Sequence, residues 1–261
     1  MDGFAVISRE EHQAANGMHR LLRSIIPPEA VKGSVGDIGY TCIKVPEYLE
    51  RRKLRQAMSM ANKITRVVVS KDYNVNYSRL CYYSMLIRAL DFYCISLGCD
   101  LRLHEVVIGD AATGEGVAAF KLLCPIARRI LLVTDNKKRL EGIAEKAMID
   151  YGISAAVIEN PIKAAERSDA IILASDNDRY SHLLIKDRPT LIMRFPRLPI
   201  SGKWFDTAGL GFMGKEGTEE VAVQGYLSYL KKDRIWQAAE KEGFTIDAIM
   251  QQGRIILNRQ L

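Results

Sequence analysis

The sequence predicts an α/β protein built on a Rossmann-like, doubly wound parallel sheet, with a smaller N-terminal α/β domain before it. Residues 106–108 are a short run of β-branched apolar residues, typical of a strand buried on both faces of a parallel sheet. A turn with three glycines and an apolar helical segment follow it directly. From residue 130 onward, short apolar runs alternate with helical segments, which is the pattern of consecutive βαβ units.

We expect an N-terminal domain over residues 1–96, including a helix that connects it to the next domain. The spacing of Ser8 and Glu11 fits a capping box, and the helix that it would start ends at Pro27 and Pro28. The other expected elements are a glycine-containing loop, a short strand, a charged helix, a second strand and the connecting helix, at residues 31–39, 40–45, 47–64, 66–70 and 78–97.

The turn GDAATGEG, residues 109–116, lies between the first buried strand and a helix expected at 117–124. A helix N-terminus there would offer backbone N–H groups to a phosphate, and an acid after the next strand, residues 130–133, would bind ribose hydroxyls. The candidate cofactor-binding residues of this unit are Gly109, Ala111, Ala112, Thr113, Gly114, Gly116, Asp135 and Asn136.

This turn departs from the G-x-G-x-x-G pattern of dinucleotide sites. Ala111 stands where the second glycine would let the backbone approach a pyrophosphate, and Asp110 adds a negative charge beside it. Asp135 lies about twenty residues beyond the turn, as expected for the ribose-binding acid.

The nucleotide-binding domain is expected over residues 97–229. Its further helices and strands are predicted at 139–151, 155–158, 163–168, 170–174 and 190–195. Ala174 and Ser175 end one of these strands, where ligands of parallel sheets bind. A glycine-rich loop at 206–217 contains Gly211 and precedes a helix. The tail over 230–261 is expected to be mainly helical, with a short strand at 254–257, and to pack on the N-terminal domain.

Composition excludes several classes of protein. The chain is 48% hydrophobic and 26% charged, and its net charge of +6 comes from interspersed Lys and Arg, which argues against nucleic acid as a partner. Five cysteines in no metal or disulfide spacing indicate reduced thiols, and no apolar run is long enough for a membrane span. We therefore expect a cytoplasmic protein without a metal site, acting on a small molecule; a homodimer stays open.

Five stretches carry a resemblance to a known group: LGCDL, VVIGDAATGEG, LLVTDNKKRLEGIAEKA, SDAIILAS and the segment from Asp206 to Met213. Over residues 97–224 the chain resembles the NAD(P)-binding domain of the shikimate dehydrogenase and glutamyl-tRNA reductase group, at the level of the superfamily. The resemblance implies a dinucleotide cofactor and places the SDAIILAS strand and the region of Gly211 near the nicotinamide.

The departures from that group refine the expectation. In its NADP-using members an arginine after the second strand binds the 2′-phosphate, whereas Asp135 stands there in this chain, so the resemblance implies NAD over NADP. The group's catalytic Lys and Asp motif has no counterpart that aligns in the N-terminal domain. Shikimate is therefore not implied as the substrate.

Lys71 and Asp72 are the candidate catalytic residues. They follow the strand expected at 66–70 and precede the connecting helix, so we expect them to face a cleft between the two domains. A lysine beside an aspartate can donate a proton to a developing alkoxide. The favoured function is an NAD(P)-dependent oxidoreductase that acts on a small carbonyl or hydroxyl metabolite in this cleft.

Two other functions stay open. The segment ATGEG with an acid after the next strand also fits an S-adenosylmethionine-dependent methyltransferase, although Ile108 stands where that class has an acid. Asp110 and Ala111 are compatible with a nucleotide-binding scaffold that has no catalytic activity.

Overall fold

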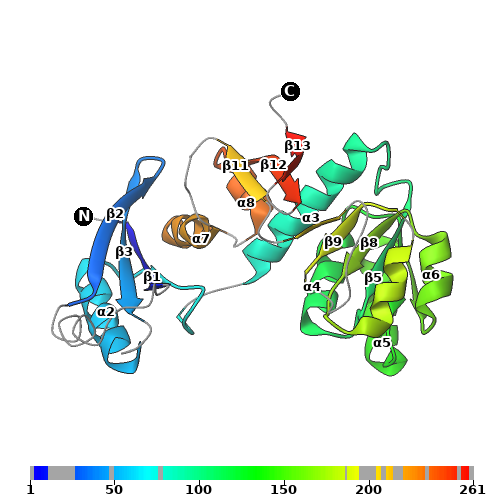
Figure 1. Cartoon of the computed structure of the whole chain (residues 1–261), viewed down its shortest axis with the longest axis horizontal. Helices are drawn as coiled ribbons and strands as arrows, with labels where there is room; N and C mark the ends of the chain where they lie inside the picture. Colours follow the sequence, from blue (N-terminus) through cyan, green and yellow to red (C-terminus); the bar gives the residue numbers. More distant parts are fainter. Residues whose placement is uncertain are drawn as a thin grey trace. The chain divides into compact units, whose positions relative to one another are not determined.

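The computed structural model describes the chain of 261 residues except residues 1–2, 11–26, 47–49, 76–78, 186, 194–203, 207–209, 214–219, 233–234, 252–253 and 259–261. The chain divides into two compact units (Figure 1). The first comprises Met1–Cys81 and Gly214–Phe244, and the second comprises Tyr82–Met213 and Thr245–Leu261. These limits differ from the predicted ones, because most of the connecting helix groups with the second unit and the end of the chain is shared between the two.

The first unit contains a four-stranded sheet in the order β2-β3-β1-β4. Its strands are β1 (Phe4–Glu10), β2 (Glu29–Val35), β3 (Ile38–Pro46) and β4 (Val68–Val69). Strand β1 pairs in parallel with β3 and β4, while β2 is the antiparallel hairpin partner of β3. Consecutive residues of β1, from Phe4 to Ile7, are apolar and buried, so both faces of the sheet need a covering helix.

Helices cover both faces of this sheet. The helix α2 (Glu50–Ile64) packs Ala57 and Ala61 against Ile7 and Ile43. The helix α7 (Glu220–Tyr229) contacts β1 and β4, and Gly225 lies directly against Phe4. A short helix, α8 (Trp236–Lys241), packs on α7. A segment from the end of the chain therefore completes the N-terminal unit.

Two expectations for this unit were wrong. Ser8 lies in strand β1 with its hydroxyl 3.4 Å from Cys42 Sγ, and so it does not begin a helix. The predicted helix otherwise falls on residues 11–26, outside the described residues. Much of the expected loop at 31–39 is strand β2 and the turn to β3, in which Gly36 has a φ of 60° that favours glycine.

The second unit contains a six-stranded parallel sheet in the order β10-β9-β8-β5-β6-β7. Its strands are β5 (Glu105–Gly109), β6 (Arg129–Val133), β7 (Ser154–Ile158), β8 (Ala170–Leu173), β9 (Thr190–Ile192) and β10 (Trp204–Asp206). Numbered along the chain, this is the order 3-2-1-4-5-6 read from the other edge, which defines the Rossmann fold. The doubly wound parallel sheet predicted from the sequence is confirmed.

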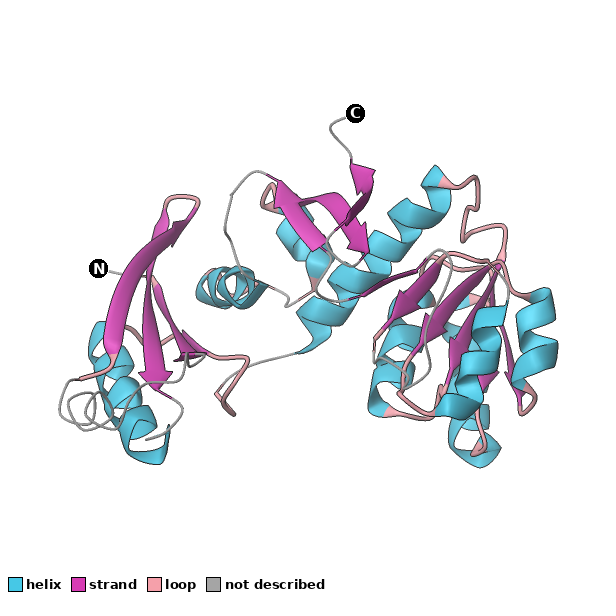
Figure 2. Cartoon of the chain, in the orientation of Figure 1, coloured by secondary structure: helices cyan, strands magenta, loops and turns pink. Residues whose placement is uncertain are grey.

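Helices flank this sheet (Figure 2). They are α4 (Gly114–Leu123), α5 (Lys137–Tyr151), α6 (Pro161–Arg167) and the 3₁₀ segment η2 (Asp178–Ile185). The chain adds β6 and β7 on one side of β5 and then crosses back to β8, so α6 and η2 lie on the face opposite α4 and α5. Val107, Leu131 and Leu173 form the core with α6 and η2 on that face.

The remaining elements of this unit include α3 (Arg79–Ser96), a buried helix that delivers the chain to β5. The end of the chain adds a three-stranded antiparallel sheet of β11 (Leu210–Met213), β12 (Thr245–Gln251) and β13 (Arg254–Asn258). Strand β13 confirms the short strand expected at 254–257, whereas the expected glycine-rich loop is partly strand β11 and the tail also contains strand β12.

Candidate functional site

The turn after β5 is held against the neighbouring strands. Ala111 N–H donates to Val133 O at 3.0 Å, and Ala174 N–H donates to Gly109 O at 3.1 Å. Asp110 adopts a positive φ of 56°, which turns the chain sharply away from the sheet. The carboxyl ends of β5, β6 and β8 therefore meet at this turn.

Thr113 caps the N-terminus of α4. Its hydroxyl accepts from Gly116 N–H at 3.0 Å and donates to Asp110 O at 2.8 Å. Among the described residues, the N–H groups of Ala112 and Gly114 donate no backbone hydrogen bond. These groups and the positive end of the helix dipole form the kind of site that binds phosphate.

Gly116 provides the close packing of this helix on the strand. A Cβ at Gly116 would lie 2.7 Å from both Ala111 Cα and Asp110 O, whereas a Cβ at Gly114 would meet no atom within 4 Å. Close helix–strand packing is the role of the third glycine in a dinucleotide turn. Gly116 has this packing role here, and the alignment of Ala111 with the second glycine stays a prediction.

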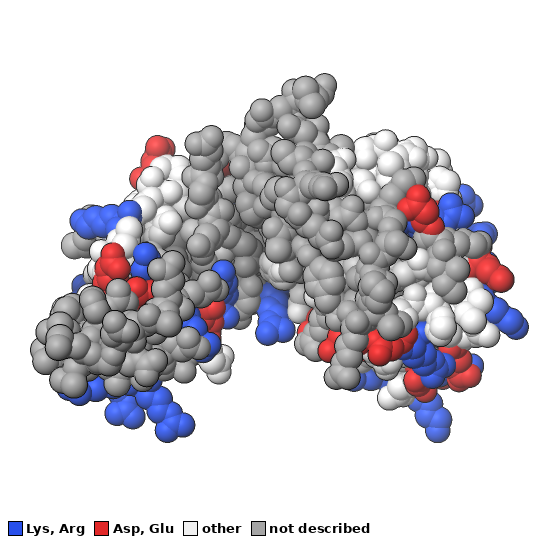
Figure 3. Space-filling model, in the orientation of Figure 1, with Lys and Arg blue, Asp and Glu red and all other residues white. Residues whose placement is uncertain are grey.

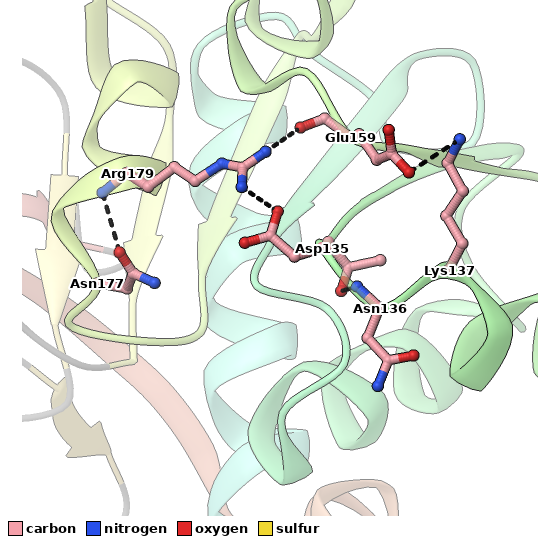
Figure 4. Close-up of polar contacts among 7 residues, drawn as sticks. Asp135, Asn136, Lys137, Glu159, Asn177 and Arg179 are labelled. Atoms are coloured by element: carbon pink, nitrogen blue, oxygen red, sulfur yellow. Dashed lines mark hydrogen bonds and ion pairs between the residues drawn. The ribbon is translucent and has the colours of Figure 1, made fainter.

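The acid after β6 is engaged by an arginine. Asp135 Oδ1 forms an ion pair with Arg179 Nη1, and Arg179 Nη2 donates to Glu159 O at 2.9 Å (Figure 4). Lys137 Nζ lies 3.2 Å from Glu159 Oε1. Asn136 N–H donates to Thr134 Oγ1 at 3.0 Å, which fixes the backbone after the strand.

Sequence reasoning missed Arg179 and Glu159. Glu159 follows β7 directly, so the rule that ligands bind at the carboxyl ends of parallel strands was a signal for it. Arg179 gave a weaker signal, because it lies in η2, several residues beyond β8, and reaches Asp135 only through the fold.

The segment after β8 is ordered by short-range hydrogen bonds. Ser175 Oγ accepts from Asn177 N–H at 3.2 Å, and Asn177 Oδ1 accepts from Arg179 N–H at 3.1 Å. The next residue, Tyr180, is buried, and burial raises its pKa to about 12, with Asp110 and Asp135 acting in the same direction. Tyr180 is therefore a neutral phenol that anchors η2 in the core.

The structure brings most of the predicted cofactor-binding residues to one edge of the sheet. These are Gly109, Ala111, Ala112, Thr113, Gly114, Gly116, Asp135, Asn136, Ala174 and Ser175. Gly211 lies instead in β11, where it pairs with Ala248.

Lys71 and Asp72 belong to the first unit. They lie in the turn after β4, where Asp72 Oδ2 accepts from Arg9 N–H at 2.7 Å and Lys71 is exposed. Ser70 Oγ accepts from the N–H groups of Asp72 and Tyr73 and so shapes this turn. Both candidates therefore lie at the carboxyl ends of the parallel strands β1 and β4, in the sheet of their own unit.

Cavities are also found at the opposite edge of the Rossmann sheet. One of about 240 Å³ is lined by Glu105, Arg129, Ser154 and Arg167, all near the amino ends of the strands or on the helix beside them. This edge carries no part of the turn or of Asp135.

Acidic and basic side chains are mixed on the described surface visible in Figure 3. Within the described residues, no group of three or more potential metal-binding side chains occurs.

No protein-family model matches the sequence, and no curated protein is similar to it. Solved structures with a similar arrangement include shikimate 5-dehydrogenase from Listeria monocytogenes in complex with shikimate and NAD, with a TM-score of 0.41 and 10% identity over 92% of this chain and 96% of that one. Shikimate dehydrogenase from Mycobacterium tuberculosis has a TM-score of 0.40 and 9% identity over 87% and 92% of the two chains. L-tryptophan dehydrogenase from Nostoc punctiforme has a TM-score of 0.39 and 10% identity over 92% and 83%.

The assignment of a Rossmann fold rests on the strand order of the six-stranded sheet itself. None of the helices in the described part of the chain has the length and apolar character needed to cross a bilayer.

Proposed function

We propose that the second unit binds NAD along the carboxyl edge of its parallel sheet, and that the chain is an oxidoreductase acting on a small carbonyl or hydroxyl compound. One observation carries the proposal: the N-terminus of α4 and Asp135 follow the adjacent strands β5 and β6 of a sheet in Rossmann order. In that arrangement a pyrophosphate and a ribose of the same dinucleotide have separate partners.

Each part of the dinucleotide has a partner in this proposal. The N–H groups at the start of α4 bind the pyrophosphate, and Thr113 shapes their position through its cap. Asp135 and Asn136 bind the adenosine ribose. Ala174 and Ser175, buried next to Gly109, border the nicotinamide half, for which Gly211 is a further candidate.

The bound nicotinamide would supply hydride chemistry, and the protein would supply the proton. Lys71 is the candidate donor to the developing alkoxide, since it is exposed at the carboxyl ends of β1 and β4. Asp72 follows Lys71 in the same turn, and its carboxylate accepts a hydrogen bond from Arg9 N–H. The location of the substrate between the domains stays a prediction from the sequence.

The test is thermal unfolding of the full chain with NAD, NADP or S-adenosylmethionine. A ligand held at one hundred times its dissociation constant stabilises the folded state by about 2.7 kcal/mol. We expect NAD to stabilise the unaltered chain, and the same NAD concentration to stabilise the Asp135→Ala protein less. Stabilisation by S-adenosylmethionine alone would instead support a methyltransferase, and no response to any ligand would support a scaffold.

A further inference from the structure

The contact between Arg179 and Asp135 bears on the choice between NAD and NADP. A ribose-binding carboxylate serves NAD because its two oxygens can accept from the 2′- and 3′-hydroxyls. Here Asp135 Oδ1 is already paired with Arg179 Nη1 (Figure 4). A ribose that reaches Asp135 therefore meets a carboxylate that already has a cationic partner on Oδ1.

Arg179 is positioned for this contact from both ends. Its backbone N–H is held by Asn177 Oδ1 at 3.1 Å, next to the buried Tyr180. Its guanidinium also donates to Glu159 O at 2.9 Å, so it spans the carboxyl ends of β6 and β7. Lys137, the neighbouring cation, is held 3.2 Å from the Glu159 carboxylate.

The pair is weak enough to be opened by a ligand. The Arg179 and Asp135 side chains are 44% and 54% exposed. An exposed ion pair of this kind changes an equilibrium constant by about fivefold at most. A guanidinium also matches the geometry of a phosphate and can bind it through two parallel hydrogen bonds. The same side chain therefore competes with a 2′-hydroxyl and is a partner for a 2′-phosphate.

Building on the proposed function, we propose that Arg179 is a specificity-determining residue of the ribose site. It weakens NAD binding by occupying Asp135, and it supports NADP binding by contacting the 2′-phosphate. The chain consequently binds NAD and NADP with affinities within about tenfold of each other.

The experiment is a double-mutant cycle with Arg179→Met and Asp135→Asn, with dissociation constants for NAD and NADP measured by calorimetric titration of the full chain. Arg179→Met should tighten NAD binding by about two- to fivefold and weaken NADP binding by about tenfold. Asp135→Asn should weaken NAD binding by about tenfold and tighten NADP binding. Adding Arg179→Met to Asp135→Asn should abolish the gain in NADP affinity.

A matched control is Arg167→Met, which removes another exposed arginine of the same unit, 3.5 Å from Glu105 at the amino edge of the sheet. It should leave both dissociation constants unchanged. If Arg179→Met protein still binds dinucleotide and the ratio of its NAD and NADP dissociation constants is unchanged, the role of Arg179 is overturned while the proposed function stands. Absence of dinucleotide binding in the unaltered chain would overturn the proposed function, and the inference with it.

Discussion

A Cβ atom on Gly116 would lie 2.7 Å from the Cα of Ala111, so the first turn of α4 and the turn after β5 are in backbone contact. This contact fixes the N-terminus of the helix above the carboxyl end of β5. A side chain at Gly116 would therefore force the backbone of α4 or of the turn to move.

Gly116→Ala should destabilise the second unit by about 1–3 kcal/mol and weaken NAD binding, because the added methyl group forces α4 away from Ala111. Urea unfolding of the full chain measures the first effect and NAD titration the second. Gly114→Ala is the control, since a Cβ there meets no atom within 4 Å. It should leave stability unchanged or raise it by up to about 1 kcal/mol. Equal losses from the two substitutions would contradict the packing account.

Gly225→Ala should destabilise the first unit by about 1–3 kcal/mol. The new Cβ would lie 2.3 Å from Cδ2 of Phe4, whose ring is buried and stacked on Tyr40 with centroids 5.1 Å apart. Gly142 of α5 has open space around it, so Gly142→Ala should be neutral or stabilising. Thermal unfolding that shows no loss for Gly225→Ala would argue against the packing of α7 on β1.

Cys99 should be alkylated by iodoacetamide with a midpoint near pH 7. A hydrogen bond from the Cys94 side chain is the main cause that lowers the pKa of Cys99 to about 7, and His104 and Arg188 act in the same direction. The thiolate reacts, so the rate should rise with pH through that value. Burial raises the pKa of Cys124 to about 11, which makes this thiol a slow internal control.

Cys94→Ala tests the cause of that shift. Without the hydrogen bond, the pKa of Cys99 should rise, and the alkylation midpoint should move to higher pH. Mass spectrometry of digested protein separates the two thiols. A midpoint that does not respond to Cys94→Ala would show that the neighbouring charges, and not the Cys94 thiol, set the pKa of Cys99.

Lys71→Met should reduce NADH formation by about 10²- to 10⁴-fold on any substrate that the chain oxidises, while the dissociation constant of NAD stays within about threefold. Loss of a proton-transfer group affects the transition state and not dinucleotide binding. The control is Lys137→Met, which removes a lysine 3.2 Å from Glu159. Any effect of this change should fall on the affinity for NAD, and the turnover rate should stay the same. Full turnover in Lys71→Met protein would remove Lys71 from the mechanism.

The sequence by itself determined the elements whose residues carry a local pattern. The apolar run at 106–108 and the later alternation of strands and helices predicted the parallel sheet, because strands buried on both faces must be apolar along their length. The αL cap at Gly152, with a φ of 67°, is likewise a local property. Asp135 was identifiable because its place after the second strand depends only on spacing along the chain.

The tertiary structure decided what depends on partners distant in sequence. Strand β1 was missed because Ser8 and Glu11 also fit a helix cap, and only pairing with β3 and β4 selects the strand. Strand β11 gains its hydrogen bonds from β12, which lies far along the chain. Arg179 reaches Asp135 because η2 folds back across the sheet, so no local pattern around residue 135 shows that its carboxylate is already paired. Spacing along the chain positions a residue on its own strand, but only the packed sheet determines which side chains from other strands meet it.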